Sequence, residues 1–339
     1  MPLPLVVAAN AAVGKRWAHH AIAILAGFTA GGAFLFGAFD LTAPGSAVGN
    51  PMGVDIGIMV TGVVAATMAA KPVRERLARF LPVDADNPVH SYALVLAVIL
   101  LGAQVSSLAF SNVFATVNSL PPLTIGDLAA NEAPYLIMAY AGVGIWMRRS
   151  LAESSDRLGL VAPAWWHITL ALGAAGAFWG IGLGADWLSH VLTPGLASQV
   201  DRSNAHEYGG LFGAPGILAI GLLPGICEDL LFRGALQPRF GLIATAVLFA
   251  ALHINYGVTI DLVAILVLAI GLGLIRKYLN TTASMTCHTT YNLLVGLAFA
   301  GTYRMGVFAL AAVLLAVSLV QLRLRPQSQP ESVEEEAVR

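Results

Sequence analysis

Ten long apolar segments constrain the fold of this chain more than any other feature of its sequence. A helix needs about 20 mainly apolar residues to cross the hydrocarbon core of a bilayer. Segments of about this length lie at 21–39, 54–70, 91–110, 130–147, 166–188, 211–237, 241–256, 258–275, 282–300 and 304–321. Only 11% of the 339 residues are charged, against roughly a quarter in soluble domains. The sequence therefore predicts an all-α, polytopic membrane protein: a transmembrane helix bundle of about ten helices.

The positions of Lys and Arg predict how this bundle is oriented. If the N-terminus faces the cytoplasm, Arg202 and Arg304 are the only two of the 18 basic residues that face outward. Loops rich in Lys and Arg remain in the cytoplasm, so both termini are predicted to be cytoplasmic. We expect an integral, multi-pass protein, located in the plasma membrane of a bacterium.

Composition excludes several classes of function. The net charge of −1 and the pI near 6.7 provide no basic field, so nucleic acid is not an expected partner. Two cysteines are too few for a disulfide framework or a Cys-rich zinc site. The first 20 residues lack the order of features that marks a cleaved signal peptide, and this segment is expected to be retained.

Three polar segments are predicted to lie outside the bilayer. The basic segment 71–83 is interpreted as a cytoplasmic loop, in preference to an amphipathic helix lying on anionic lipid. Segment 111–132, with Asp127 and Glu132, is expected to be a solvated loop. The tail 323–339 is rich in Pro, Gln and Glu and is expected to be disordered.

A fourth polar segment, 189–210, carries several residues that can bind metal, namely His190, Asp201, His206 and Glu207. A metal site is conceivable there. Their spacing matches no established ligand pattern, however, so a polar loop is the preferred interpretation.

Charged residues interrupt one apolar segment at 221–234, GLLPGICEDLLFRG. A charge at membrane depth costs a few kcal/mol or more, so it faces a protein interior or wet cavity and marks a functional site. Asp229 and Arg233 are four residues apart on one helix face and can pair. Glu228 points about 100° away from Asp229, so its partner must come from another helix. The alternative is a buried ion-pair cluster that only holds the bundle together.

Two later segments carry polar residues at the same helical spacing. Phe249 and His253 are four residues apart, as are His288 and Asn292. With a rise of 1.5 Å per residue from the cytoplasmic helix ends, Glu228, His253, His288 and Asn292 lie at depths of about 15, 18, 12 and 18 Å. These depths are near the middle of a ~30 Å hydrocarbon core, so the four side chains are predicted to line one cavity.

Pro224 lies one turn before Glu228. Proline has no backbone N–H, so it should remove the helical hydrogen bond to the carbonyl near Ile220 and kink the helix beside the carboxylate. Broken backbone at this depth is tolerated where it is buried or lines a wet cavity.

These groups together permit hydrolysis of an acyl bond such as a peptide. A buried carboxylate has a raised pKa, which suits a general base near neutral pH. Glu228 could take a proton from water, and His253 could orient that water. His288 and Asn292 could donate hydrogen bonds to the oxyanion of a tetrahedral intermediate.

The order Glu-Asp-x-x-x-Arg, Phe-x-x-x-His and His-x-x-x-Asn, each on its own apolar helix, resembles the CAAX-protease and bacteriocin-processing family of intramembrane endopeptidases. This family includes the type II CAAX prenyl endopeptidases. The resemblance covers about 210–300 and implies a glutamate-type protease without a cofactor. It implies that Glu228 and His253 activate the hydrolytic water and that His288 and Asn292 form the oxyanion site. The supporting residues are then Asp229, Arg233 and Phe249.

This chain departs from the family's usual Glu-Glu pair by placing Asp at position 229. The shorter side chain still reaches Arg233, so a supporting role is expected. Cys227 and Cys287 each precede a motif residue and suggest a thiol mechanism. Each points about 100° away from its neighbour and neither has a base on its own helix, so both are interpreted as small apolar fillers.

Two alternatives remain. The first is a zinc-dependent membrane protease in which Glu228, His253 and His288 are metal ligands. The second is a non-catalytic transporter or scaffold, although transport favours paired broken helices in two related halves, and the polar cluster occurs only in the second half.

The expected organisation follows the position of these motifs. A catalytic helical core follows five scaffold helices, and the expected partners are the lipid bilayer and a protein or peptide substrate of unknown identity. The predicted divisions are a cytoplasmic N-terminus at 1–20, scaffold helices at 21–209, the core at 210–300, a last helix at 301–322 and a tail at 323–339.

Overall fold

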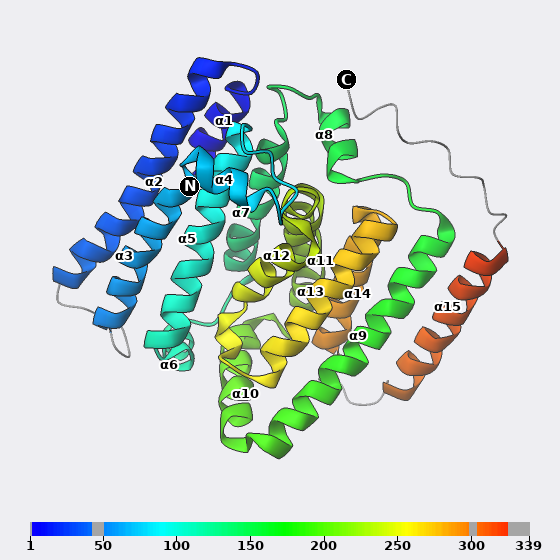
Figure 1. Ribbon diagram of the computed structural model, residues 1–339. Helices are drawn as coiled ribbons and strands as arrows, with labels where there is room; N and C mark the ends of the chain where they lie inside the picture. The colour runs from blue at the N-terminus through cyan, green and yellow to red at the C-terminus, as the bar shows by residue number, and fades with distance from the viewer. Residues whose placement is uncertain (1, 43–50, 298–303, 325–339) are drawn as a thin grey trace.

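The computed structural model describes residues 2–42, 51–297 and 304–324, and within them the protein is helical, with no strand (Figure 1). This confirms the predicted all-α class. The α-helices are α1 Leu3–Ala11, α2 Arg16–Thr42, α3 Pro51–Met68, α4 Lys71–Leu77, α5 Pro88–Phe110, α6 Val113–Ser119, α7 Ile125–Val143, α8 Leu151–Leu158, α9 Trp165–Leu192, α10 Pro194–Tyr208, α11 Ala214–Asp229, α12 Gln237–Ala251, α13 Ile260–Tyr278, α14 Thr281–Leu297 and α15 Arg304–Leu324. The shorter turns are η1 Gly209–Leu211, the π-helical η2 Leu230–Leu236 and η3 Ile254–Tyr256.

Five helices in the described ranges are long and apolar enough to cross a membrane. They are Trp17–Thr42, Pro88–Phe110, Trp165–Leu192, Ala214–Ala251 and Gly306–Arg323. The pair α3 and α4, bent by 87°, would make a sixth. A helix occupies each of the ten expected segments, but this criterion supports fewer than ten spans. The reasons are local: α14 has 17 residues, and α13 carries Asp261, Arg276 and Lys277 at its ends.

The 38-residue apolar stretch Ala214–Ala251 contains two of the expected segments, 211–237 and 241–256. The chain breaks helical geometry at Gly241, where φ is 78° and ψ is 171°. Positive φ is accessible to glycine without steric cost. The chain can therefore turn here between η2 and the rest of α12.

The helices carrying the sequence motifs lie in the middle of the bundle. Figure 1 shows α2, α3 and α5 on one side, α9 and α15 on the other, and α11 to α14 between them. Helix α11 packs against α14 and α7, and α14 also packs against α9 and α13. Helices α2, α3 and α5 on one side and α9 and α15 on the other therefore flank the motif-bearing core, and both α7 and α9 contact it directly.

Two glycines allow α11 and α14 to pack closely. A Cβ added at Gly225 would collide with Thr289, and one added at Gly221 would collide with Leu293. Small residues are a common means of bringing membrane helices together. This close packing places Glu228 of α11 beside His288 of α14.

The prediction that 111–132 is a solvated loop is wrong. Helix α7 begins at Ile125, after a capping box in which Thr124 and Asp127 satisfy each other's backbone N–H groups. Glu132 is therefore well inside a helix and is buried.

Residues 189–210 also differ from the expected polar loop, because 194–208 form α10. Helix α10 packs on α9, α6, η1 and η3 at the end of the bundle opposite α8 (Figure 1). Phe114 of α6 and Val200 of α10 form a hydrophobic cluster there with Ile254 and Tyr256. This cap lies directly against the chain that follows His253.

The first 20 residues are also more structured than a simple terminal segment. Asn10 of α1 is buried and donates a hydrogen bond to the Ala141 carbonyl of α7 at 2.8 Å. Arg148 donates two hydrogen bonds to the Asn10 side-chain oxygen, at 3.0 and 2.6 Å. Residues 325–339, which hold most of the expected disordered tail, lie outside the described residues.

Candidate active site

The centre of the candidate site is the ion pair between Asp229 and Arg233. Arg233 Nη1 lies 3.2 Å from Asp229 Oδ1, and both side chains are buried. The predicted i,i+4 pairing is confirmed. The pair spans the start of the π-helical turn η2, a form of helix that occurs mostly as single turns and frequently at functional sites.

His288 of α14 lies between the two adjacent acidic residues of α11. Its Nδ1 is 3.2 Å from Asp229 Oδ1, and its Nε2 is 3.9 Å from Glu228 Oε2. An ionised carboxylate can only accept hydrogen bonds, so Nδ1–H is the donor to Asp229. This bond directs Nε2 toward Glu228, at a distance slightly too long for a hydrogen bond.

Glu228 is buried, and its Oε2 has no hydrogen-bond partner among the described residues. The contacts of Asp229 differ, since its Oδ1 lies close to both Arg233 and His288. The two neighbouring carboxylates therefore have different environments. Asp229 belongs to a charge network through Oδ1, whereas Glu228 has no arginine at ion-pair distance. Each carboxylate keeps one oxygen without a hydrogen-bond partner among the described residues, Asp229 Oδ2 and Glu228 Oε2.

Phe249 connects the charge network to the second motif. The guanidinium carbon of Arg233 lies 4.0 Å from the Phe249 ring centroid, a cation–π distance. The Phe249 centroid is 4.9 Å from that of His253 and 5.7 Å from that of His288. A single aromatic ring thus contacts both histidines and the arginine.

The hydrogen bond of His253 identifies its tautomer. Its Nδ1 lies 3.1 Å from the Phe249 carbonyl oxygen, which can only accept, so Nδ1 carries the hydrogen. Nε2 of the neutral ring then holds a lone pair. His253 follows the end of α12 at Ala251 and precedes η3, so it lies at a helix terminus and not at mid-helix.

Asn292 contacts the backbone beside Pro224. Its amide nitrogen donates to the Ile220 carbonyl at 3.5 Å, a long hydrogen bond. Ile220 is the residue whose helical acceptor role Pro224 removes, as the sequence predicted. Among the four residues expected to line one cavity, the contacts place His288 beside Glu228 and connect His253 to His288 through Phe249. Asn292 lies one turn further along α14.

Residues 210–294 match the protein-family model described as type II CAAX prenyl endopeptidase Rce1-like. The match contains all three motifs. This segment, called the Rce1-like domain below, is therefore similar to that protease family. Neither the curated proteins nor the solved structures contain a match to the chain. The matched range lies within the expected core at 210–300.

One candidate residue outside the Rce1-like domain was missed by the sequence reasoning. Glu132 of α7 is buried, and its Oε2 has no hydrogen-bond partner among the described residues. Glu132 and Glu228 interact electrostatically, and their helices pack together. A charge inside an apolar run was the signal that identified Glu228, and the same signal at Glu132 was missed because Glu132 was assigned to the predicted solvated loop 111–132.

The cysteines lie within the Rce1-like domain and are both buried and free. Cys287 packs in a hydrophobic cluster with Ala171, Leu272 and Ala283. Cys287 therefore has the surroundings expected of a small apolar side chain.

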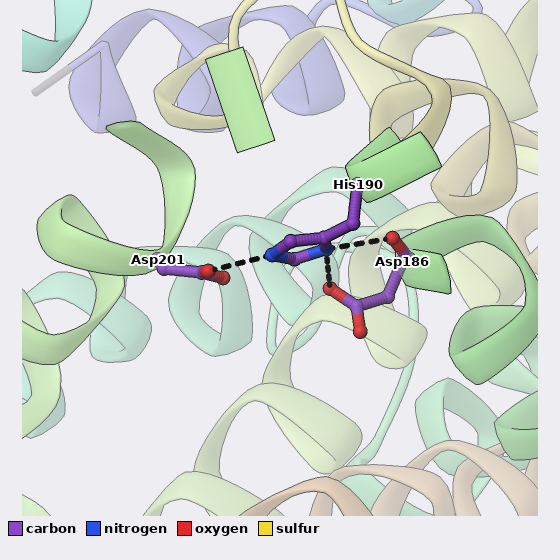
Figure 2. Close-up of side chains that lie close together, drawn as sticks. All are labelled: Asp186, His190 and Asp201. Carbon is purple, nitrogen blue, oxygen red and sulfur yellow. Dashed lines mark hydrogen bonds and ion pairs between the residues drawn. The ribbon is translucent and has the colours of Figure 1, made fainter. Parts of the chain in front are cut away.

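A separate polar cluster lies outside the Rce1-like domain, where α9 meets α10 (Figure 2). His190 Nε2 lies 3.0 Å from Asp201 Oδ2, and His190 Nδ1 lies 2.9 Å from the Asp186 carbonyl oxygen. Among the described residues, Asp186, His190 and Asp201 form the group of potential metal ligands whose atoms all lie within 4.8 Å of one another. All three are exposed, and their hydrogen bonds account for the arrangement. Glu228, His253 and His288 are not part of such a group.

Proposed function

We propose that the Rce1-like domain is a glutamate-type intramembrane endopeptidase in which Glu228 activates the water that cleaves a peptide bond. The observation that supports this role is the difference between the two adjacent carboxylates. Asp229 is held through Oδ1 by Arg233 and His288, whereas Glu228 makes only a 3.9 Å contact with His288. Glu228 Oε2 has no hydrogen-bond partner among the described residues, and the same is true of Asp229 Oδ2. A general base needs such an oxygen within reach of the proton that it removes.

In the proposed reaction, Glu228 takes a proton from water and the resulting hydroxide attacks the peptide carbonyl carbon. His253 accepts a hydrogen bond from the same water through Nε2, whose lone pair is free when Nδ1–H donates to Phe249. Glu228 then passes the proton to the amine nitrogen as the C–N bond breaks. This route restores the carboxylate for the next cycle.

The oxyanion of the tetrahedral intermediate would receive hydrogen bonds from His288 and Asn292. His288 can donate from Nε2 when that nitrogen also carries a hydrogen. Asn292 has two amide hydrogens, of which one points to Ile220, leaving the other for substrate. Asp229 and Arg233 hold His288 in position, and Phe249 packs the histidines against the arginine.

We assign a protein or peptide as the substrate class, without requiring it to be prenylated, and the plasma membrane of a bacterium as the location. The zinc-dependent alternative would use Glu228, His253 and His288 as ligands. The family match favours a protease over a transporter or scaffold.

The proposal is tested by comparing newly formed protein termini in cells that express wild type, Glu228→Gln or Glu75→Gln at matched membrane levels. Glu75 is an exposed residue of α4, so its variant controls for loss of an acidic group. Termini that require Glu228 but not Glu75 would support the proposed base. Equal termini in wild type and Glu228→Gln, with both proteins folded, would refute it.

A further inference from the structure

A cavity of about 460 Å³ lies between the scaffold and the Rce1-like domain. Its wall combines residues of α1, α5, α7, η2 and α12. None of Glu228, His253, His288 or Asn292 lines it, although one wall residue, Phe232, has its ring centroid 5.4 Å from that of Phe249. Ligand cavities are typically about 300–1,000 Å³. This cavity is thus large enough for a ligand and adjoins the candidate site without containing it.

The interior of the cavity is apolar. Its walls include Val6 of α1, Leu96 and Leu100 of α5, Met138 of α7 and Leu248 of α12. These apolar side chains offer no donor or acceptor to a ligand, although the lining also includes the polar groups of Asn87, His90, Tyr92 and Tyr135. An alkyl chain is the ligand class that this interior suits.

Four arginines also line this cavity: Arg148, Arg149, Arg157 and Arg239. Arg148 and Arg239 are exposed, and the other two are partly buried. They come from the α7–α8 connection, from α8 and from the turn before Gly241, so three separate segments converge to place them. The largely apolar cavity is therefore lined by four positively charged side chains.

In the described structure, Glu153 interacts electrostatically with Arg149, but none of the four arginines makes a direct ion pair with a carboxylate. Among the described residues, no carboxylate lies within 4.0 Å of any of them. Their hydrogen bonds go to neutral oxygens. Arg148 donates to the Asn10 side chain, Arg149 to the Val143 carbonyl at 2.5 Å and Arg157 to the Gly234 carbonyl at 3.4 Å.

The four arginines also repel one another electrostatically. Burial, together with Arg239, Arg149 and other nearby arginines, lowers the pKa of Arg157 to about 10. Burial, followed by repulsion from Arg149 and Arg239, also lowers the pKa of Arg148. An anion bound among the four side chains would relieve this repulsion.

We propose that this cavity binds an anionic phospholipid, with one acyl chain in the apolar interior and the phosphate among Arg148, Arg149, Arg157 and Arg239. Guanidinium groups match phosphate oxygens in paired hydrogen bonds. The acyl chain requires the largely apolar interior, and the phosphate requires the arginines that make no direct ion pair with a carboxylate. A lipid held here contacts both the scaffold and the Rce1-like domain, and so joins the two parts of the bundle.

The test uses the purified full-length chain in detergent, with lipid binding counted by native mass spectrometry and stability measured by thermal unfolding. The first variant is Arg157→Gln with Arg239→Gln. The second is Ala97→Phe, which narrows the cavity at a lining residue without changing charge. The control is Arg76→Gln with Arg79→Gln, which removes two exposed arginines outside the cavity.

We expect phosphatidylglycerol to bind wild type and the control and to raise their unfolding temperature, whereas phosphatidylcholine does not. Each arginine near a membrane surface contributes about fivefold to binding of anionic lipid, so the double cavity variant should bind about 25-fold more weakly. Ala97→Phe should also lose binding while retaining its arginines.

Three results would overturn the proposal. Unchanged lipid binding in Arg157→Gln with Arg239→Gln would show that these arginines do not bind the phosphate. Unchanged lipid binding in Ala97→Phe would show that the cavity interior does not hold the acyl chain. Equal stabilisation by inorganic phosphate would show an anion site that needs no acyl chain. Because none of these measurements uses cleavage activity, they do not depend on the proposed protease function.

Discussion

Asn292 donates its side-chain amide to the Ile220 carbonyl, 3.5 Å away, in the turn of α11 that Pro224 leaves without a helical donor. This contact gives Asn292 a structural partner in addition to its proposed catalytic one. The two roles can be separated, because the structural role exists only while position 224 lacks an N–H group.

We expect Asn292→Ala to lower kcat by about 10²–10³-fold, the usual effect of losing one oxyanion donor. It should also destabilise the protein by about 1 kcal/mol, because the Ile220 carbonyl loses its partner. In a Pro224→Ala background the stability cost should largely disappear while the loss of kcat persists. The measurements are cleavage rates and denaturant unfolding of wild type, Asn292→Ala, Pro224→Ala and the double variant. A loss of kcat that also disappears with Pro224→Ala would assign Asn292 a structural role alone.

Glu228→Gln and Arg233→Ala should differ in their effects on the fold. Glu228→Gln keeps the side-chain volume and removes the proposed base, so cleavage should be abolished with little loss of stability. Arg233→Ala leaves Asp229 buried without its cation, which typically costs about 3–5 kcal/mol, so both fold and activity should suffer. Cleavage and thermal unfolding, measured side by side, test this. Wild-type activity in Glu228→Gln would disprove the assigned base.

The local parts of this site could be predicted from the sequence, whereas the contacts between helices could not. The Asp229–Arg233 pair follows from helical spacing alone, and so does the effect of Pro224 on the Ile220 carbonyl. The contact between His288 and Asp229 depends on how closely α14 approaches α11. Nothing in the order of the motifs specifies that approach.

Glu132 illustrates a different limit. Its burial depends on where α7 begins, and the capping box of Thr124 and Asp127 was the available signal for that boundary. Treating Asp127 as a loop residue moved the predicted start of the helix to residue 130, so Glu132 fell where the predicted loop 111–132 overlaps the predicted helix 130–147. The arginine-lined cavity was equally hidden, since Arg148, Arg157 and Arg239 come from segments that only tertiary packing brings together.

Gly225 is expected to determine the distance between Glu228 and His288. A Cβ at this position would collide with the backbone of Thr289, so Gly225→Ala should move α11 away from α14 and reduce cleavage by at least about tenfold. Gly184 of α9 is the matched control, because no heavy atom lies within 4 Å of a Cβ built there. Gly184→Ala should leave cleavage unchanged and stabilise the helix by up to about 1 kcal/mol. Equal activity in the two variants would show that close α11–α14 packing is not required.

Activity should survive removal of metal. A water activated by Glu228 and His253 needs no Lewis acid, so cleavage should persist after prolonged treatment with strong chelators. Purified active protein should also contain far less than one equivalent of zinc by elemental analysis. Loss of activity on chelation, with recovery on adding Zn²⁺, would instead support the alternative in which Glu228, His253 and His288 are ligands.

The exposed cluster of Asp186, His190 and Asp201 requires a control, since weak metal binding there must not be mistaken for a catalytic ion. Asp201→Asn should remove such binding without changing cleavage.

Glu132 should contribute to function at the expense of stability. Its Oε2 is buried without a hydrogen-bond partner, and such a group costs about 1–3 kcal/mol. Glu132→Gln replaces a buried charge facing Glu228 with a neutral amide of similar size, so the unfolding temperature should rise. Cleavage should fall by about tenfold or more, because a carboxylate opposite the proposed base can hold the substrate or its water in place. Measuring unfolding temperature, kcat and KM on the same preparations distinguishes the possibilities. A stabilised variant with unchanged kcat and KM would show that Glu132 takes no part in the reaction, and that the carboxylate of Glu228 acts without a second acidic partner.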